Sequence, residues 1–178
     1  MTEQIQGDNK AEGRSAQLLD EMNRIMVSIG ATARCKKLPH ESSVCEKLKG
    51  KVVTVVDDSL ELLVNNVPDL VVATDGSANA IHYKNQSPEE IADQIIELRT
   101  EIVLLDYALK RTAFPYKVVV SGVDVMKALK QKGYKGKIVG YSSDGKFQEE
   151  FMNNGAICCI DKNAFEQGKE ILKIAEVI

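Results

Sequence analysis

The sequence predicts an α/β fold built on a doubly wound, five-stranded parallel sheet. The main observation is a set of short apolar runs that each lead into a polar side chain; they lie at 51–56, 101–105, 137–141 and 156–160. Continuous apolar runs of this length are typical of parallel strands that are covered on both faces. Segments with helical periodicity lie between the runs, and this alternation implies right-handed crossovers. With 178 residues, 44% of them hydrophobic, the chain can bury one good core.

The first 49 residues are predicted to lie outside the sheet. Residues 1–14 are charged and show no periodicity, which is typical of a disordered segment. Apolar residues then recur at helical spacing through 15–29, and Gly30 is suited to end that helix in a left-handed cap. The expected division is therefore a disordered N-terminus, a helical extension with its connection at 15–49, and a compact domain at 50–178.

The first helix of the compact domain is expected near 60–73, and Pro68 should break or bend it. The second strand is placed at about 79–84, after the turn residues Asp75-Gly76. A competing interpretation makes 70–74 the second strand, paired through the same turn as a hairpin. The sequence leaves both interpretations open.

The next helix has the clearest start in the chain. Ser87 is suited to be its N-cap, and Pro88 occupies the first helical position, where the missing N–H has no partner to lose. Later helices are expected near 122–132 and 147–153, followed by a closing helix that carries Phe165, Ile171, Leu172 and Ile174.

Composition and charge exclude several classes of protein. The net charge is −3 with no long basic block, so neither nucleic acid nor a membrane surface is an expected partner. No apolar stretch approaches the ~20 residues of a membrane span, and the polar N-terminus is unlike a signal peptide. The cysteines show no Cys-x-x-Cys spacing, so we expect reduced thiols in the cytoplasm, with neither a disulfide nor zinc; they are Cys35, Cys45, Cys158 and Cys159.

Polar side chains stand where four predicted strands end: Asp57, Asp58, Asp106, Ser142 and Lys162. Ligands of a doubly wound sheet bind beyond the carboxyl ends of its strands, so these five side chains are expected to meet. Taken singly, each would suit an ordinary turn or surface position. Their joint occurrence at four strand ends is what indicates a site.

The chemistry of such a site follows from its residue types. Two carboxylates about 4 Å apart repel by roughly 4 kcal/mol at an effective dielectric of about 20, so three need a proton or a divalent cation. An all-oxygen site with open positions suits Mg²⁺, which commonly links carboxylates to a phosphate. The ammonium of Lys162 and the hydroxyl of Ser142 would hold phosphoryl oxygens. Asp106, alone at its strand end, would be the nucleophile that forms an aspartyl phosphate.

Residues 50–178 resemble the receiver domain of bacterial two-component response regulators. The resemblance is carried by the motifs KVVTVVDDS, EIVLLDY, KIVGYSS and GAICCIDK, and by SGVDVMKAL at the third helix. It implies a flavodoxin-like fold with strand order 2-1-3-4-5.

The resemblance also implies a role for each site residue. Asp106 would be the phosphoacceptor, Ser142 the switch hydroxyl and Lys162 the phosphate-binding amine. The magnesium ligands would be the carboxylates of Asp57, Asp58 and Asp106 with the backbone carbonyl of Ala108. The donor would be a phosphohistidine on a sensor histidine kinase or a histidine phosphotransfer protein. Such a domain catalyses only its own phosphorylation and dephosphorylation, so it is a signalling module and not an enzyme.

Several departures from the family pattern concern the signalling relay. Asn163 replaces the proline that usually follows the lysine, and Cys159 replaces the usual aromatic switch residue. The connection at 107–120 is longer than usual, with Lys110 in place of a common proline. The alternative function is therefore a receiver-like interaction module whose output is altered or independent of phosphate. A haloacid-dehalogenase-type phosphatase is excluded, because the Asp-x-Asp pattern that it needs after the first strand is absent.

Two expectations concern partners and output. The apolar stripe of the 15–29 helix should either cover its own domain or pair two chains as a homodimer. Cys159 is too small to act as a swinging ring, so a response to phosphate should concentrate in the loop 142–146 and the connection 107–120, with little change at 156–160.

Overall fold

The structure of the protein is a computed structural model that describes residues 46–75, 77–111, 117–162 and 174–177. The predicted disorder at 1–14 and the predicted helix at 15–29 lie outside these residues. So does most of the predicted closing helix, of which a turn at 174–177 is described.

Five parallel strands form the central sheet, in the order β2-β1-β3-β6-β7. Counted among themselves these strands have the order 2-1-3-4-5, so the predicted fold class and strand order are confirmed. The strands are β1 (Val53–Asp57), β2 (Ala78–His82), β3 (Ile102–Asp106), β6 (Lys137–Tyr141) and β7 (Cys158–Ile160). Every residue of β1 and of β3 is buried, as their unbroken apolar runs predicted.

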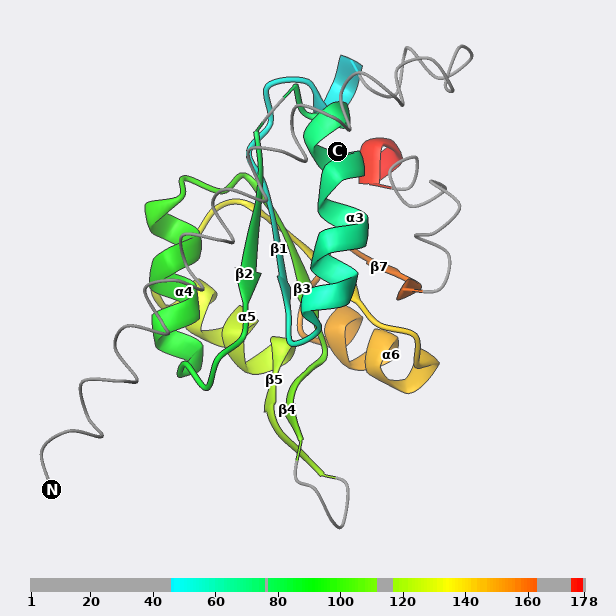
Figure 1. Ribbon diagram of the computed structural model, residues 1–178. Coiled ribbons are helices and arrows are strands. Elements are labelled where there is room, and N and C mark those ends of the chain that lie inside the picture. The colour runs from blue at the N-terminus through cyan, green and yellow to red at the C-terminus, as the bar shows by residue number, and fades with distance from the viewer. Residues whose placement is uncertain (1–45, 76, 112–116, 163–173, 178) are drawn as a thin grey trace, which may run out of the picture.

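Helices cover both faces of the sheet (Figure 1). On one face lies α3 (Leu60–Ala73), whose buried residues share a core cluster with Ile174 and Ala175 near the C-terminus. The other face carries α4 (Pro88–Glu97), α5 (Gly122–Gln131) and α6 (Gly145–Asn153). No helix in the described part of the chain is long and apolar enough to cross a membrane.

The helix α3 settles the two open questions about the first crossover. It continues from Leu60 to Ala73, so the strand interpretation of 70–74 is wrong, and so is the predicted break at Pro68. The missing hydrogen bond at a helical proline costs about 3 kcal/mol. Burial of one apolar side of the helix against the sheet offsets this cost; that side carries Leu63, Val67, Leu70 and Val71.

Reciprocal caps fix the starts of α4 and α5. The Ser87 hydroxyl accepts the Glu90 N–H at 3.2 Å, and the Glu90 carboxylate accepts the Ser87 N–H at 2.7 Å, as the predicted start requires. Ser121 and Asp124 repeat the arrangement at α5, with distances of 3.2 and 2.9 Å. Each cap supplies hydrogen-bond partners for backbone N–H groups at the start of its helix.

A second, two-stranded antiparallel sheet was not predicted. It consists of β4 (Ala108–Arg111) and β5 (Val118–Ser121), whose strands lie almost entirely within the predicted connection 107–120. The hairpin projects from the edge at which the parallel strands end (Figure 1). It therefore lies next to the predicted site, because β4 begins two residues after Asp106.

The two described cysteines, Cys158 and Cys159, lie in β7 as thiols, and both are half-buried. Burial, together with the neighbouring thiol, raises the pKa of Cys159 to about 11. Cys159 thus remains a thiol at neutral pH, and it donates a hydrogen bond to the Gln148 carbonyl of α6 at 3.3 Å. Cys35 and Cys45 lie outside the described residues.

Candidate functional site

Three carboxylates meet at the carboxyl ends of β1 and β3. Asp57 ends β1, Asp58 follows it, and Asp106 ends the neighbouring strand β3. One carboxylate oxygen from each lies within 4.8 Å of the others. Asp57 is 0% exposed and Asp106 is 4% exposed, whereas Asp58 faces solvent. The sheet topology therefore creates the acidic cluster that the sequence predicted.

The ammonium of Lys162 lies between two of these acids. Its Nζ is 2.6 Å from Asp57 Oδ2 and 2.9 Å from Asp106 Oδ1, and its side chain is only 13% exposed. The same Nζ lies 5.1 Å from the centroid of the Tyr141 ring, at a distance suited to a cation–π contact. The other oxygen of Asp57 accepts the Ser59 N–H at 2.8 Å, so both of its oxygens are hydrogen-bonded.

Asp106 is the acid whose protonation is most affected by this environment. Burial raises the pKa of its carboxyl to about 6; the Lys162 ammonium opposes the increase, and the charges on Asp57 and Asp58 add to it. Three ionised carboxylates with one ammonium leave a formal charge of −2. Their all-oxygen donor set fits a hard divalent cation such as Mg²⁺. Such a cation would favour the ionised, nucleophilic form of Asp106.

Ser142 reaches the same site from the end of β6. It is 5% exposed, and its N–H donates to the Ile160 carbonyl at 3.1 Å, which links it to β7. Its Oγ accepts the Asp144 N–H at 3.2 Å, and its carbonyl accepts the side-chain amide of Gln148 at 3.1 Å. Ser142 is therefore tied to the start of α6.

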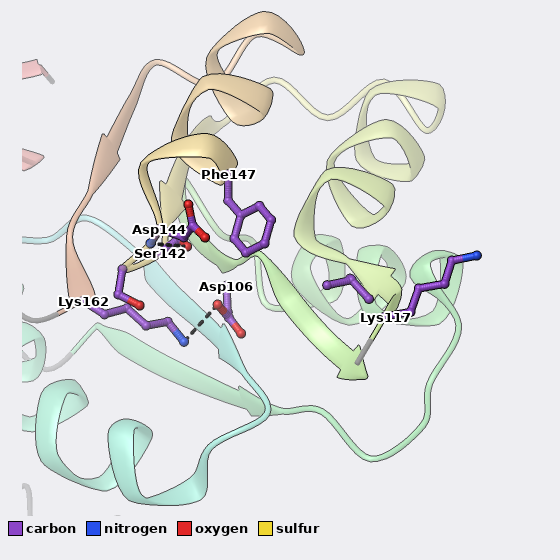
Figure 2. A pocket seen from close by; sticks show the side chains of 8 residues that line it. Asp106, Lys117, Ser142, Asp144, Phe147 and Lys162 are labelled. Atoms are coloured by element: carbon purple, nitrogen blue, oxygen red, sulfur yellow. Dashed lines mark hydrogen bonds and ion pairs between the residues drawn. The ribbon is translucent and has the colours of Figure 1, made fainter. Parts of the chain in front are cut away.

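A pocket of about 360 Å³ opens above these side chains (Figure 2). Its lining residues are Asp106, Lys117, Val118, Ser142, Ser143, Asp144, Phe147 and Lys162. Figure 2 shows Asp106 and Lys162 pointing toward each other, while the Lys117 side chain is turned away from them. The structure thus brings the predicted acceptor, hydroxyl and amine to one cavity.

Ala108 is the remaining predicted ligand. It is 1% exposed and begins β4, where it pairs with Ser121 of β5. Its position two residues after Asp106 is compatible with the predicted role of its carbonyl, and that role stays a prediction.

A glycine lets α5 approach the acceptor strand closely. A Cβ on Gly122 would lie 2.2 Å from the backbone oxygen of Asp106, which is far inside contact distance. The Gly122 N–H also donates to the Tyr107 carbonyl at 2.9 Å. Gly122 therefore lets the start of α5 lie directly against the Asp106 and Tyr107 carbonyls.

No model of a protein family matches the sequence, and no curated protein matches it either. Solved structures do match the fold. The RcsB response regulator of Salmonella typhimurium aligns with a TM-score of 0.52 at 10% identity, covering 71% of this chain and 61% of RcsB. The receiver domain of NtrX from Brucella abortus aligns at 0.50 and 19% identity, covering 70% of this chain and 94% of that domain. A DNA-binding response regulator of the LuxR family from Staphylococcus aureus aligns at 0.50 and 15% identity, covering 69% and 96%. The chain therefore shares the fold of these response-regulator structures.

Sequence reasoning missed the aromatic and polar residues beside the pocket. The rings of Tyr107 and Phe147 stack with their centroids 3.8 Å apart, and the Tyr107 hydroxyl donates a hydrogen bond to Glu150. On the other side of the acids, the His82 Nε2 lies 3.1 Å from the Asp58 carbonyl oxygen. These contacts join separate elements across long sequence intervals. Only the position of Tyr107, directly after the predicted acceptor, marked it in the sequence.

Proposed function

We propose that this receiver domain accepts a phosphoryl group on Asp106, with Mg²⁺, from a phosphohistidine of a sensor histidine kinase or a histidine phosphotransfer protein. The observation that carries the proposal is the position of the Asp106 carboxylate. It is buried beneath the pocket and lies 2.9 Å from the Lys162 ammonium. One of its oxygens also lies within 4.8 Å of an oxygen of each of the two further acids.

Asp57, Asp58 and Asp106 would hold the magnesium ion, together with the Ala108 carbonyl. When bound, the ion supplies positive charge that offsets the repulsion between the acids and the incoming phosphoryl oxygens. The donor set supports this assignment because all of its atoms are oxygens and one acid, Asp58, faces solvent.

In the transfer step, an ionised Asp106 oxygen attacks phosphorus. The P–N bond to the donor imidazole breaks, and its electron pair stays on the imidazole nitrogen. Lys162 would then turn from Asp106 to a phosphoryl oxygen while it keeps its contact with Asp57. The Ser142 hydroxyl accepts the Asp144 N–H through its oxygen, so its own hydrogen can be donated to a second phosphoryl oxygen.

A second candidate is a receiver-like interaction module with altered or phosphate-independent output. Cys159 is the observation that favours it, since a thiol stands where the resembling family has an aromatic switch residue. Its Sγ is hydrogen-bonded to the Gln148 carbonyl of α6, so it is held by packing and by a weak bond.

Intact-mass measurement after incubation with Mg²⁺ and acetyl phosphate tests the proposal. The wild-type protein should gain one phosphoryl group, whereas Asp106→Asn and a sample with EDTA should not. Labelling of Asp106→Asn at the wild-type rate would overturn the assignment. Absence of labelling in a folded wild-type protein with bound Mg²⁺ would favour the second candidate.

A further inference from the structure

One wall of the pocket is the aromatic ring of Phe147. The pocket holds about 360 Å³. A water molecule takes about 30 Å³ in the liquid, so a phosphoryl group on Asp106 would leave room for water. Of the eight lining residues only Phe147 and Val118 are apolar. Figure 2 shows the Phe147 ring extending from α6 toward the side of the pocket on which Asp106 lies.

The residue directly after the acceptor holds this ring in place. The Tyr107 and Phe147 rings are stacked at 3.8 Å and are inclined by only 3°. Phe151, one turn further along α6, meets the Tyr107 ring edge-on at 5.9 Å and 84°. Tyr107 therefore contacts α6 through two rings on the same side of the helix.

Tyr107 is itself fixed at both ends. Its carbonyl accepts the Gly122 N–H, and its hydroxyl donates to Glu150, three residues after Phe147 on α6. A displacement of the Phe147 ring would have to break or distort these contacts.

We propose that Phe147 sets the lifetime of the phosphoryl group on Asp106 by limiting the access of water, and that Tyr107 is the positioning residue for its ring. The inference rests on the proposed function and specifies how that site is regulated. In hydrolysis, a water oxygen attacks phosphorus and the P–O bond to Asp106 breaks. The electron pair returns to the carboxylate, inorganic phosphate leaves, and the water gives up a proton to solvent. An aromatic wall offers that water no strong hydrogen bond, so it removes partners that would hold the water for attack.

The test measures loss of phosphate from protein labelled with acetyl phosphate and Mg²⁺, followed by intact mass after the donor is removed. Phe147→Ala should be labelled and should lose phosphate several-fold faster than wild type, while Phe147→Leu, which keeps an apolar wall, should lie between them. Tyr107→Leu should also shorten the lifetime, and Tyr107→Phe, which keeps the stacked ring, should largely restore it. The matched control is Met152→Ala, an exposed apolar residue of α6 outside the pocket lining.

A second readout is the release of beryllofluoride, a phosphoryl mimic, followed by ¹⁹F NMR. A merely structural defect at α6 would lower the melting temperature without changing this rate selectively. We expect faster release from Phe147→Ala and an unchanged rate for Met152→Ala. If all variants are labelled and share the wild-type phosphate lifetime, the inference is wrong and the proposed function stands. If not even the wild-type protein is labelled, both are wrong.

Discussion

Lys162→Met is expected to destabilise the protein strongly when no metal is bound, because it removes the cation between two buried acids. The ammonium lies 2.6 Å from Asp57 and 2.9 Å from Asp106, whose side chains are 0% and 6% exposed. Removing one partner of a buried ion pair typically costs 3–5 kcal/mol, since the remaining charge loses its compensation. We expect about 3 kcal/mol, at the low end of that range. The reason is that Asp106, whose pKa is already raised to about 6, can take up a proton.

The chain provides a matched control for burial. Lys132 forms an ion pair with Asp93 at the same distance of 2.6 Å, but the two side chains are 31% and 56% exposed. Exposed pairs contribute roughly 0–1 kcal/mol, so Lys132→Met should have little effect. The free energy of unfolding is measured by urea titration in EDTA and again with saturating Mg²⁺. Magnesium should recover part of the loss in Lys162→Met, because it binds the unpaired acids of the native state.

The reasoning fails if Lys162→Met and Lys132→Met lose similar stability in EDTA. It also fails if Mg²⁺ widens the difference between Lys162→Met and wild type by more than about 1 kcal/mol, since the cation would then depend on the lysine rather than substitute for it.

Three further predictions concern pH, signalling and association. In EDTA, the pKa of Asp106 is higher in the folded state than in the unfolded state. The free energy of unfolding should therefore fall by about 3 kcal/mol as pH rises from about 4 to about 6. Urea titrations at a series of pH values should show this slope in wild type and not in Asp106→Asn. On binding of beryllofluoride, hydrogen exchange should change most in the 142–146 loop and the β4–β5 hairpin, because Cys159 is too small to act as a switch residue. Large changes confined to β7 and the segment after it would contradict this expectation. If the helix predicted at 15–29 pairs two chains, sedimentation should show a dimer for the full chain and a monomer for a 50–178 fragment. Monomers in both samples would rule out pairing.

The positions of the acids could be predicted from the sequence because they depend on local pattern and on one topological rule. Apolar runs identify β1 and β3, and each of these strands ends at an aspartate. The rule that parallel strands present their carboxyl ends at one edge then brings Asp57 and Asp106 together. Lys162 and Ser142 followed by the same argument from β7 and β6.

The hairpin could not be predicted in the same way. Its strands have four residues each, and no Asn-Gly or Asp-Gly turn joins them. The run Val118–Val120 was too short to separate a strand from a connection. The continuity of α3 was missed for a different reason: the cost of Pro68 is local, whereas the burial that offsets it depends on the sheet.

The stack of Tyr107 on Phe147 depends on tertiary structure alone. These residues are forty positions apart and meet only because α6 packs beside the end of β3. Neither the hydrophobic periodicity nor the capping pattern of the sequence indicates that these two residues are in contact. The sequence therefore indicated which polar groups would meet at the end of the sheet, and the structure was needed to show what surrounds them.

The most direct test of the central claim is the position of the phosphoryl group after labelling with Mg²⁺ and acetyl phosphate. Borohydride reduces an acyl phosphate to an alcohol, so a phosphorylated aspartate becomes homoserine and can be located by peptide mass spectrometry. We predict homoserine at position 106, dependent on both Mg²⁺ and the phosphodonor, and aspartate at 57 and 58. Homoserine at 57 or 58, or an unmodified Asp106 in protein that has gained a phosphoryl group, would contradict the assignment of Asp106 as the acceptor.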